Sequence, residues 1–101
     1  MAWVAVAQAD ELEVEDVIEV TVGDLVLAIY RTTDGYFATD GICTHQRARL
    51  AEGLVIGNII ECPKHQGRFD VRDGAAKGPP ASAPLRTHPV KVVDGTLQIE
   101  L

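Results

Sequence analysis

The sequence predicts a small all-β protein. Its apolar segments are short and rich in Val, Ile and Leu, and tight-turn dipeptides separate several of them. No segment has the apolar spacing of an amphipathic helix, and residues 7–12 have room for one helical turn at most. Short strands joined by glycine-containing turns are typical of antiparallel sandwiches and barrels. We therefore expect an antiparallel β-sandwich.

Individual strands are expected where turn dipeptides divide the apolar runs. A Gly-Asp pair joins residues 17–22 to residues 25–31, and an Asp-Gly pair then leads into a strand at 36–39. Near the end of the sequence another Asp-Gly pair separates residues 90–93 from residues 96–101. Such pairs readily form two-residue hairpin turns. Apolar and polar residues alternate in the last of these segments, which indicates a strand with one buried face.

The composition limits the classes of function. A chain of 101 residues has room for one domain. Its net charge of −6 supplies no long basic patch for phosphates, so we expect no nucleic-acid partner. No stretch approaches the roughly 20 apolar residues that span a bilayer, and the first residues lack the basic start of a secretory signal. We expect a cytoplasmic protein with no membrane partner.

Charge is unevenly divided along the chain. Residues 43–72 contain five basic and three acidic residues, whereas the remainder contains four basic and twelve acidic residues. Seven of these acids fall between residues 10 and 24, where no basic residue occurs. One interpretation of this acidic run is a solvated edge that keeps the protein soluble. The other is a charge dipole that orients residues 43–72 toward a partner.

Two Cys–His pairs carry the chemistry. Cys43 is followed two positions later by His45, and Cys62 is followed three positions later by His65. The chain has no other cysteine and only one other histidine, His88. Two thiolates and two imidazoles form a complete four-ligand set for an iron–sulfur cluster or a transition metal. Between the pairs, a Gly-Asn dipeptide flanked by apolar residues predicts a hairpin that would bring them together.

The two pairs and their surroundings resemble the cluster loops of the Rieske [2Fe–2S] proteins. Residues 43–45 read Cys-Thr-His, and residues 62–70 read Cys-Pro-Lys-His-Gln-Gly-Arg-Phe-Asp. They are most similar to the small Rieske ferredoxins of bacterial aromatic-ring-hydroxylating dioxygenase systems. The resemblance covers essentially the whole chain. It implies the Rieske fold, with an antiparallel β-sandwich base at 1–40 and 81–101 and an inserted cluster-binding subdomain at about 41–80.

The resemblance also implies the cofactor. One [2Fe–2S] cluster would be held with Cys43 and Cys62 on one iron and His45 and His65 on the other. Neutral imidazoles in place of two thiolates make the added electron easier to accept, so such centres have higher potentials than all-cysteine ferredoxins. The chain has Phe69 where respiratory relatives have a tyrosine hydroxyl near the sulfurs, and it has no spare cysteines for their disulfide. We therefore expect a potential near the low end of the Rieske range, roughly −150 mV.

The function implied by the resemblance is one-electron transfer. The donor would be a flavin-containing ferredoxin reductase, and the acceptor would be a terminal Rieske non-haem iron oxygenase in aromatic compound degradation. A mononuclear oxygenase iron needs two histidines and a carboxylate. After a cluster takes two histidines, only His88 remains. The chain is thus expected to be an electron-transfer component and not an enzyme by itself. Pro79 and Pro80 could form a plain turn or a rigid lid beside the cluster, and the resemblance favours the lid.

Three alternatives remain open at this point. Two cysteines and two histidines also suit a structural zinc ion in tetrahedral coordination. The chain could also be a Rieske-like small subunit of a reductase such as assimilatory nitrite reductase, although many such subunits lack the four ligands. A binding module that uses a metal only to hold its shape is the third alternative.

Overall fold

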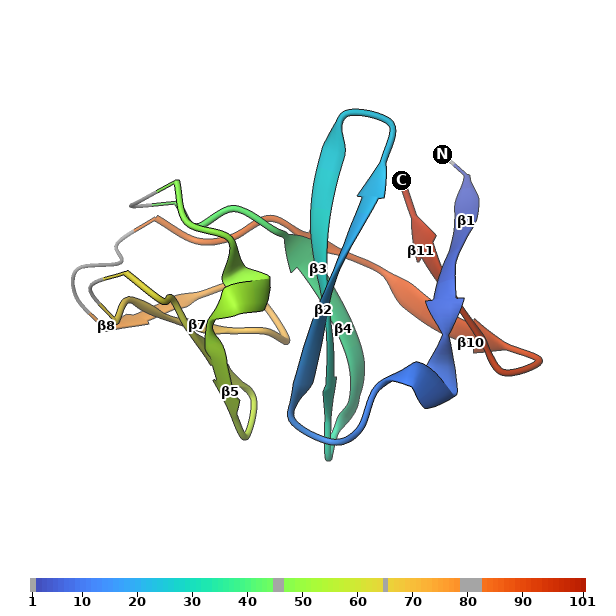
Figure 1. Cartoon of the computed structure of the whole chain (residues 1–101), viewed down its shortest axis with the longest axis horizontal. Helices are drawn as coiled ribbons and strands as arrows, with labels where there is room; N and C mark the ends of the chain where they lie inside the picture. Colours follow the sequence, from blue (N-terminus) through green and yellow to red (C-terminus); the bar gives the residue numbers. More distant parts are fainter. Residues whose placement is uncertain (1, 45–46, 65, 79–82) are drawn as a thin grey trace.

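The structure of the chain is a computed structural model, shown in Figure 1. It describes residues 2–44, 47–64, 66–78 and 83–101. Within these ranges the chain forms eleven β-strands and two short 3-10 turns. The strands are β1 (Trp3–Gln8), β2 (Asp16–Val22), β3 (Leu25–Thr32), β4 (Gly35–Asp40), β5 (Leu54–Ile56), β6 (Ile59–Glu61), β7 (Arg68–Asp70), β8 (Ala76–Gly78), β9 (Thr87–His88), β10 (Val90–Val93) and β11 (Thr96–Glu100), and the turns are η1 (Ala9–Glu11) and η2 (Leu50–Glu52).

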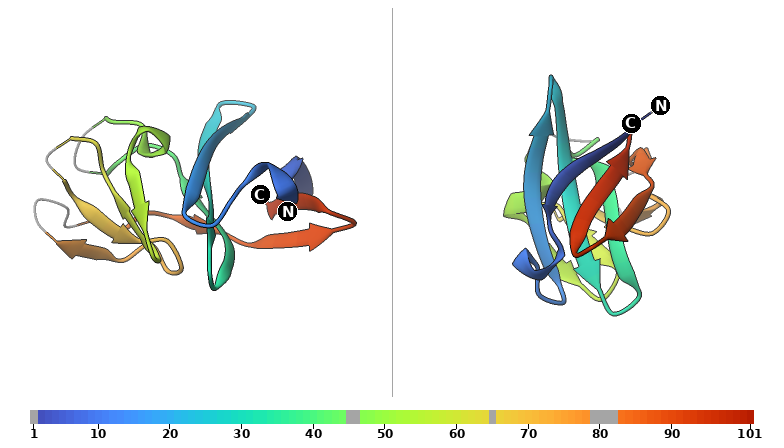
Figure 2. Two further views of the ribbon diagram at one scale, coloured as in Figure 1. Left: turned by 60° about the horizontal axis from the view of Figure 1, so that its bottom comes forward. Right: turned by 90° about the vertical axis from the view of Figure 1, so that its right-hand side faces the viewer.

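The strands form three antiparallel sheets that follow one another along the long axis of the molecule (Figures 1 and 2). The end sheet has the order β1-β11-β10, the central sheet β2-β3-β4-β9, and the third sheet β5-β6-β7-β8. The molecule measures 39 × 28 × 19 Å. The predicted all-β class is therefore confirmed, and the chain leaves the central sheet after β4, forms the third sheet and returns at β9.

The hairpin turns follow the predicted pattern. The β2–β3 pair ends with Val22 opposite Leu25, and Gly23 between them has φ +60°. At the β10–β11 turn, Asp94 and Gly95 have φ values of 50° and 78°. Positive φ at both central residues defines the mirror-image turn whose twist matches that of paired strands. The single helical turn expected within residues 7–12 is the 3-10 turn η1.

The strand β3 belongs to two hydrophobic cores. Its residues Leu27, Ala28, Ile29 and Tyr30 are all fully buried. Because side chains alternate between the faces of a strand, Leu27 and Ile29 point to one side and Ala28 and Tyr30 to the other. The first side packs against the end sheet in a cluster made of Leu12, Leu27, Ile29, Ala38, Leu97 and Ile99.

The second side of β3 packs against the region that contains the cysteines. This cluster is made of Ala28, Tyr30, Cys43, Ala48, Leu50, Val55, Ile60, Cys62, Phe69, Val71 and Leu85. Each strand of the third sheet has three residues, so one inward side chain such as Val55, Ile60 or Phe69 anchors each of β5, β6 and β7. Ala28 and Tyr30 of β3 therefore complete the core of this region.

Acidic side chains of the central sheet and its approach also hold the third sheet. Glu15 Oε2 accepts a hydrogen bond from the Gly57 backbone N–H at 2.6 Å. Asp34 Oδ2 accepts one from Asn58 Nδ2 at 2.8 Å. Both donors lie in the β5–β6 turn. Glu15, a member of the acidic run, thus binds another part of the same chain. In the described residues, no helix has the length and apolar character needed to cross a membrane.

Candidate metal centre

The first cysteine lies at the base of a tight loop that follows β4. The Cys43 N–H donates to the Ala48 carbonyl at 2.9 Å, and Ile42 forms an isolated β-bridge with Arg49. The Leu50 N–H donates to the Gly41 carbonyl at 2.9 Å, which closes the loop further down. These bonds place Cys43 at the point where the loop opens.

The second cysteine has the same position in a second loop. Cys62 directly follows β6, and its N–H donates to the Gly67 carbonyl at 2.7 Å just before β7 begins. Cys62 and Gly67 therefore close the base of a second loop. Gln66 adopts a left-handed φ of 58°, a conformation that costs a residue with a side chain some energy. The two loops are thus built alike, with a cysteine at the start of each.

The structure brings the two cysteines together. Cys43 is 4% exposed and Cys62 is 1% exposed, and no disulfide joins them. Their side chains are close enough to share a hydrogen bond, and the Lys64 backbone N–H donates to the Cys62 sulfur. Burial, with a further contribution from Cys43, raises the pKa of the Cys62 thiol to about 11. A buried thiol with a raised pKa, such as that of Cys62, becomes a thiolate when a metal cation supplies compensating charge.

The predicted histidine ligands, His45 and His65, lie outside the described residues, and so do Pro79 and Pro80 of the predicted lid. In the part of the chain that is described, no group of three or more His, Cys, Asp or Glu side chains gathers as a metal site. The arrangement of the cysteines nevertheless suits the predicted group. Both sulfurs are buried and adjacent, and each starts a loop that carries a histidine two or three positions later.

The surroundings of the cysteines are apolar. Phe69, opposite Ile60 in the sheet, is fully buried and offers no hydroxyl. The Thr39 hydroxyl donates its proton to the Asp40 carbonyl at 2.8 Å, so in its 2.8 Å contact with Tyr30 it accepts. Burial raises the pKa of Tyr30 well above its usual value, with the Cys43 charge as a lesser cause. The buried Tyr30 therefore keeps its proton and directs it to Thr39, away from a role as donor to sulfur.

Two features of this region were not predicted from the sequence. The Thr44 hydroxyl donates to the Ala83 carbonyl at 2.8 Å and ties the first loop to the segment that returns to the base. Gly74 has φ +79°, and a Cβ there would lie 2.1 Å from the Leu85 carbonyl oxygen. The Leu85 N–H also donates to the Gly74 carbonyl at 2.8 Å. The Thr44–Ala83 contact and the Gly74–Leu85 contact each join residues that are not neighbours in the sequence, so no local sequence pattern predicts them.

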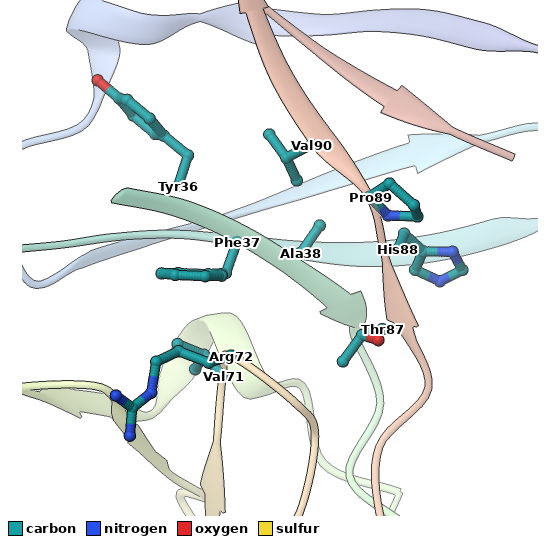
Figure 3. Close-up of a pocket in the computed structure, with 9 residues that line it drawn as sticks. All are labelled: Tyr36, Phe37, Ala38, Val71, Arg72, Thr87, His88, Pro89 and Val90. Carbon is teal, nitrogen blue, oxygen red and sulfur yellow. The ribbon is translucent and has the colours of Figure 1, made fainter. Parts of the chain in front are cut away.

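A pocket of about 290 Å³ lies where the central sheet meets the turn after β7. Figure 3 shows its lining residues, among which the Arg72 guanidinium and the His88 ring point away from each other. Arg72 Nη2 is bound to Asp70 Oδ2 at 2.8 Å, and His88 Nε2 lies 2.8 Å from Asp40 Oδ1. The Arg72 guanidinium and the His88 ring are thus each paired with a neighbouring carboxylate, and they do not converge on a substrate.

The comparisons with known proteins agree with this arrangement. The family model described as the Rieske [2Fe-2S] domain matches residues 2–89. The ferredoxin component of the naphthalene 1,2-dioxygenase system of Pseudomonas putida is 45% identical over 100 residues, which cover 98% of this chain and 95% of the relative.

Solved structures give the same result. The ferredoxin of Sphingomonas yanoikuyae B1 has a TM-score of 0.94 and 36% identity, and the match covers 99% of both chains. A chain of the complex of reduced oxygenase and oxidised ferredoxin in carbazole 1,9a-dioxygenase has a TM-score of 0.91 and 37% identity, with coverage of 96% of this chain and 91% of that chain. The resemblance and the fold predicted from the sequence are confirmed, and this chain belongs to the Rieske [2Fe–2S] domain family.

Proposed function

We propose that the chain is a one-electron carrier that holds one [2Fe–2S] cluster through Cys43, Cys62, His45 and His65. The observation that carries this proposal is the meeting of two buried cysteine sulfurs at the start of two similarly built loops, each with a histidine close behind. When bound, the cluster would accept and release a single electron. We further propose that residues 41–80 form the cluster-binding subdomain and residues 1–40 and 81–101 the base.

The residues of the chain have identifiable roles in this proposal. The buried positions of Cys43 and Cys62 keep water from the sulfurs, and the Lys64 N–H stabilises negative charge on one of them. The Thr44–Ala83 bond holds the first loop against the returning segment. These contacts would hold the cluster ligands in place, so that the protein would rearrange little on electron transfer.

The relatives support the identity of the partners. The matching proteins include ferredoxin components of naphthalene and anthranilate dioxygenase systems, and one matching chain comes from a complex of an oxygenase with a ferredoxin. We infer that this chain delivers electrons to a terminal Rieske non-haem iron oxygenase in aromatic compound degradation. A flavin-containing ferredoxin reductase would supply them. A small subunit of a putative nitrite reductase shares the fold at 19% identity, and that likeness extends no further than the fold.

Electron paramagnetic resonance with iron and zinc analysis tests the proposal. The dithionite-reduced protein should give the spectrum of a histidine-ligated cluster, and it should contain about two irons per chain. Zinc in place of iron, after purification with ample iron and without oxygen, would identify a structural zinc site and overturn the proposal.

The ligand assignment has its own test. Substitutions His45→Ala and His65→Ala should each abolish the reduced-state signal, whereas His88→Ala, at the third histidine, should keep it. A signal that survives either of the first two changes would remove that histidine from the ligand set.

The reduction potential is a separate expectation. Phe69 has no hydroxyl and Tyr30 directs its proton to Thr39, so neither of these two buried rings provides a donor that would stabilise the reduced state. A redox titration should give a midpoint near −150 mV, at the low end of the Rieske range of roughly −150 to +300 mV. A midpoint above about +100 mV would contradict this account of the environment.

A further inference from the structure

We propose that the Thr39 hydroxyl keeps the reduction potential of the cluster low by holding the Tyr30 proton away from the cysteine sulfurs. This inference rests on the proposed function and assigns a task to a residue outside the ligand set. Thr39 would act through Tyr30 and would not touch the cluster, so it is a positioning residue. Its hydroxyl would withhold one hydrogen-bond donor from the reduced cluster.

The polar side chain of Thr39 lies deep in the protein core. Among the residues that the structure describes, three polar or charged side chains are buried, and of these Thr39 alone is 0% exposed. The other two are Thr32 and Asp70. Thr32 Oγ1 accepts a hydrogen bond from the Asp34 N–H in the β3–β4 turn, and Asp70 Oδ1 accepts one from the Arg72 N–H in the turn after β7. Both of these groups hold turns of the backbone, so the buried Thr39 hydroxyl needs a different explanation.

Packing alone does not explain a threonine at this position. Valine has nearly the same shape, favours strands as well, and brings no polar group that must be satisfied in the core. The Thr39 hydroxyl makes two hydrogen bonds of 2.8 Å, one to the Asp40 carbonyl and one with the Tyr30 hydroxyl. Its single proton goes to the Asp40 carbonyl, so it accepts the proton of Tyr30. The hydroxyl of Thr39 therefore fixes the direction of the Tyr30 O–H bond.

The register of the central sheet places this pair on the side of the cysteines. Thr39 in β4 lies directly opposite Ala28 in β3, and residues in opposite positions share one face of a sheet (Figure 1). Ala28 and Tyr30 both belong to the core that contains Cys43 and Cys62. Because the side chain of Ala28 is small, it leaves room for the Thr39 hydroxyl to reach Tyr30 along the diagonal of the sheet.

The Tyr30 hydroxyl lies within electrostatic range of Cys43. Burial raises the pKa of Tyr30, and negative charge at Cys43 is a lesser cause of the same shift. A hydroxyl proton turned toward that sulfur would form a charge-assisted hydrogen bond, which is stronger than a neutral one. Because reduction adds negative charge to the cluster, such a bond would stabilise the reduced state more than the oxidised state. The direction of one proton would thus influence the potential.

Removal of the Thr39 hydroxyl should release the Tyr30 proton. In Thr39→Val the Tyr30 hydroxyl loses its acceptor, and a buried donor without a partner costs free energy, so the hydroxyl should turn to the Cys43 sulfur. The reduced state should then gain about tenfold relative to the oxidised state, which for a one-electron couple corresponds to a rise of about 59 mV in the midpoint. A redox titration of the holoprotein, followed by electron paramagnetic resonance, would measure the midpoint.

Further variants distinguish this explanation from a change in packing. The double variant Thr39→Val with Tyr30→Phe has no hydroxyl to turn, so its redox equilibrium constant should return to within a factor of about two of the wild-type value. Tyr30→Phe alone should leave the midpoint equally unchanged, because the Tyr30 proton of the wild type points to Thr39. Thr39→Ser keeps the hydroxyl and should keep the wild-type midpoint. Thr32→Val, the same change at the other buried threonine, is the matched control and should also leave the midpoint in place.

The inference is wrong if Thr39→Val does not raise the midpoint, or if the rise persists in the double variant. It is also wrong if Tyr30→Phe alone lowers the redox equilibrium constant about tenfold, since Tyr30 would then already donate to the cluster. That second arm does not require Thr39→Val to fold. In either case a normal signal from the wild-type cluster would leave the electron-carrier proposal standing. If the wild type gives no signal of a histidine-ligated cluster, the proposed function itself fails.

Discussion

The end and central sheets and the region of the cysteines are stabilised in different ways. The core between the first two sheets contains Leu, Ile and Ala side chains supplied by long strands such as β3 and β11. The third sheet has strands of three residues and a core that includes two cysteines. This core also includes Ala28 and Tyr30 of β3. The first region can bury its own apolar surface, whereas the second depends on its neighbour and on the proposed cluster.

This contrast shows why the proposed electron-transfer site lies in the less independent region. A site that must be exposed at its tip and buried at its sulfurs needs short loops, and short loops provide little apolar burial of their own. The additional stabilisation comes from the side chains of β3, from hydrogen bonds to Glu15 and Asp34 and, in our proposal, from metal–ligand bonds. The following predictions test that division, from the largest expected effect to the smallest.

Replacement of Cys62 should produce the largest difference in stability between the two regions. In Cys62→Ser we expect iron content to fall from about two per chain to nearly none, because one thiolate ligand is lost. Amides of β5–β7 should exchange with solvent at least about 100-fold faster, while amides of β3 and β11 stay protected. Residue-resolved hydrogen exchange would measure this. Equal loss of protection in all three sheets would show that the base has no independent stability.

Truncation of one core residue in each region should lower the free energy of unfolding by similar amounts, but the order in which the sheets unfold should differ. Leu97→Ala in the first core and Ile60→Ala in the second should each cost about 3 kcal/mol, because both side chains are fully buried. Leu97→Ala should lower the denaturation midpoint of the whole chain. Ile60→Ala should open the third sheet before the other two. Identical unfolding curves at probes in the two regions of Ile60→Ala would mean that the chain unfolds as a single unit.

The buried carboxylate Asp70 should make the third-sheet region sensitive to acid. Hydrogen bonds from Arg72 hold the pKa of Asp70 below its usual value, and the Arg72 charge adds to the effect. A lowered pKa in the folded state means that the stabilisation is complete above the ordinary Asp value of about 4 and is lost as the pH falls further.

Asp70→Asn should therefore lower the free energy of unfolding by about 2 kcal/mol at pH 7, and this difference from the wild type should become smaller below about pH 4. Urea unfolding of both proteins at a series of pH values would measure the difference. A constant difference down to pH 3 would contradict the assigned role of the charge.

The contacts of Glu15 and Asp34 should contribute least. Each acceptor lies at the surface, where solvent weakens charged contacts, so Glu15→Gln and Asp34→Asn should each cost about 0.5 kcal/mol and the pair about 1 kcal/mol. The effect should appear as faster exchange in the β5–β6 turn. Asp10→Asn, an exposed member of the acidic run, is the matched control. An equal effect from Asp10→Asn would indicate a general charge effect and not these specific bonds.

The sequence predicted the features that depend on neighbouring residues. Gly23 and the Asp94-Gly95 pair specify their turns through backbone conformation, so the hairpins could be assigned directly. The hairpin between β5 and β6 was likewise predicted, and with it the meeting of Cys43 and Cys62. These predictions hold because the determining residues lie next to the structure that they determine.

Features formed by distant segments could not be predicted in this way. The pairing of Trp3–Gln8 with the last strand, and of β4 with Thr87–His88, joins opposite parts of the chain. Neither the Glu15–Gly57 bond nor the Thr44–Ala83 bond has a local signature. The acidic run shows the difficulty well, because its composition suggested only solvent or a partner, and the structure places Glu15 and Glu19 against the chain itself.

The two-sided burial of β3 also has a consequence for how this protein tolerates substitution. A residue on an edge strand or on a half-exposed strand can change as long as one face stays apolar. In β3 both faces are fully packed from Leu27 to Tyr30, so adjacent positions are constrained by different neighbours. In a saturation library selected for folded protein, this four-residue stretch should accept fewer replacements than the four residues of β10, which are mostly exposed. Variation should therefore accumulate in exposed segments such as β10, while the strand that belongs to both cores stays nearly fixed.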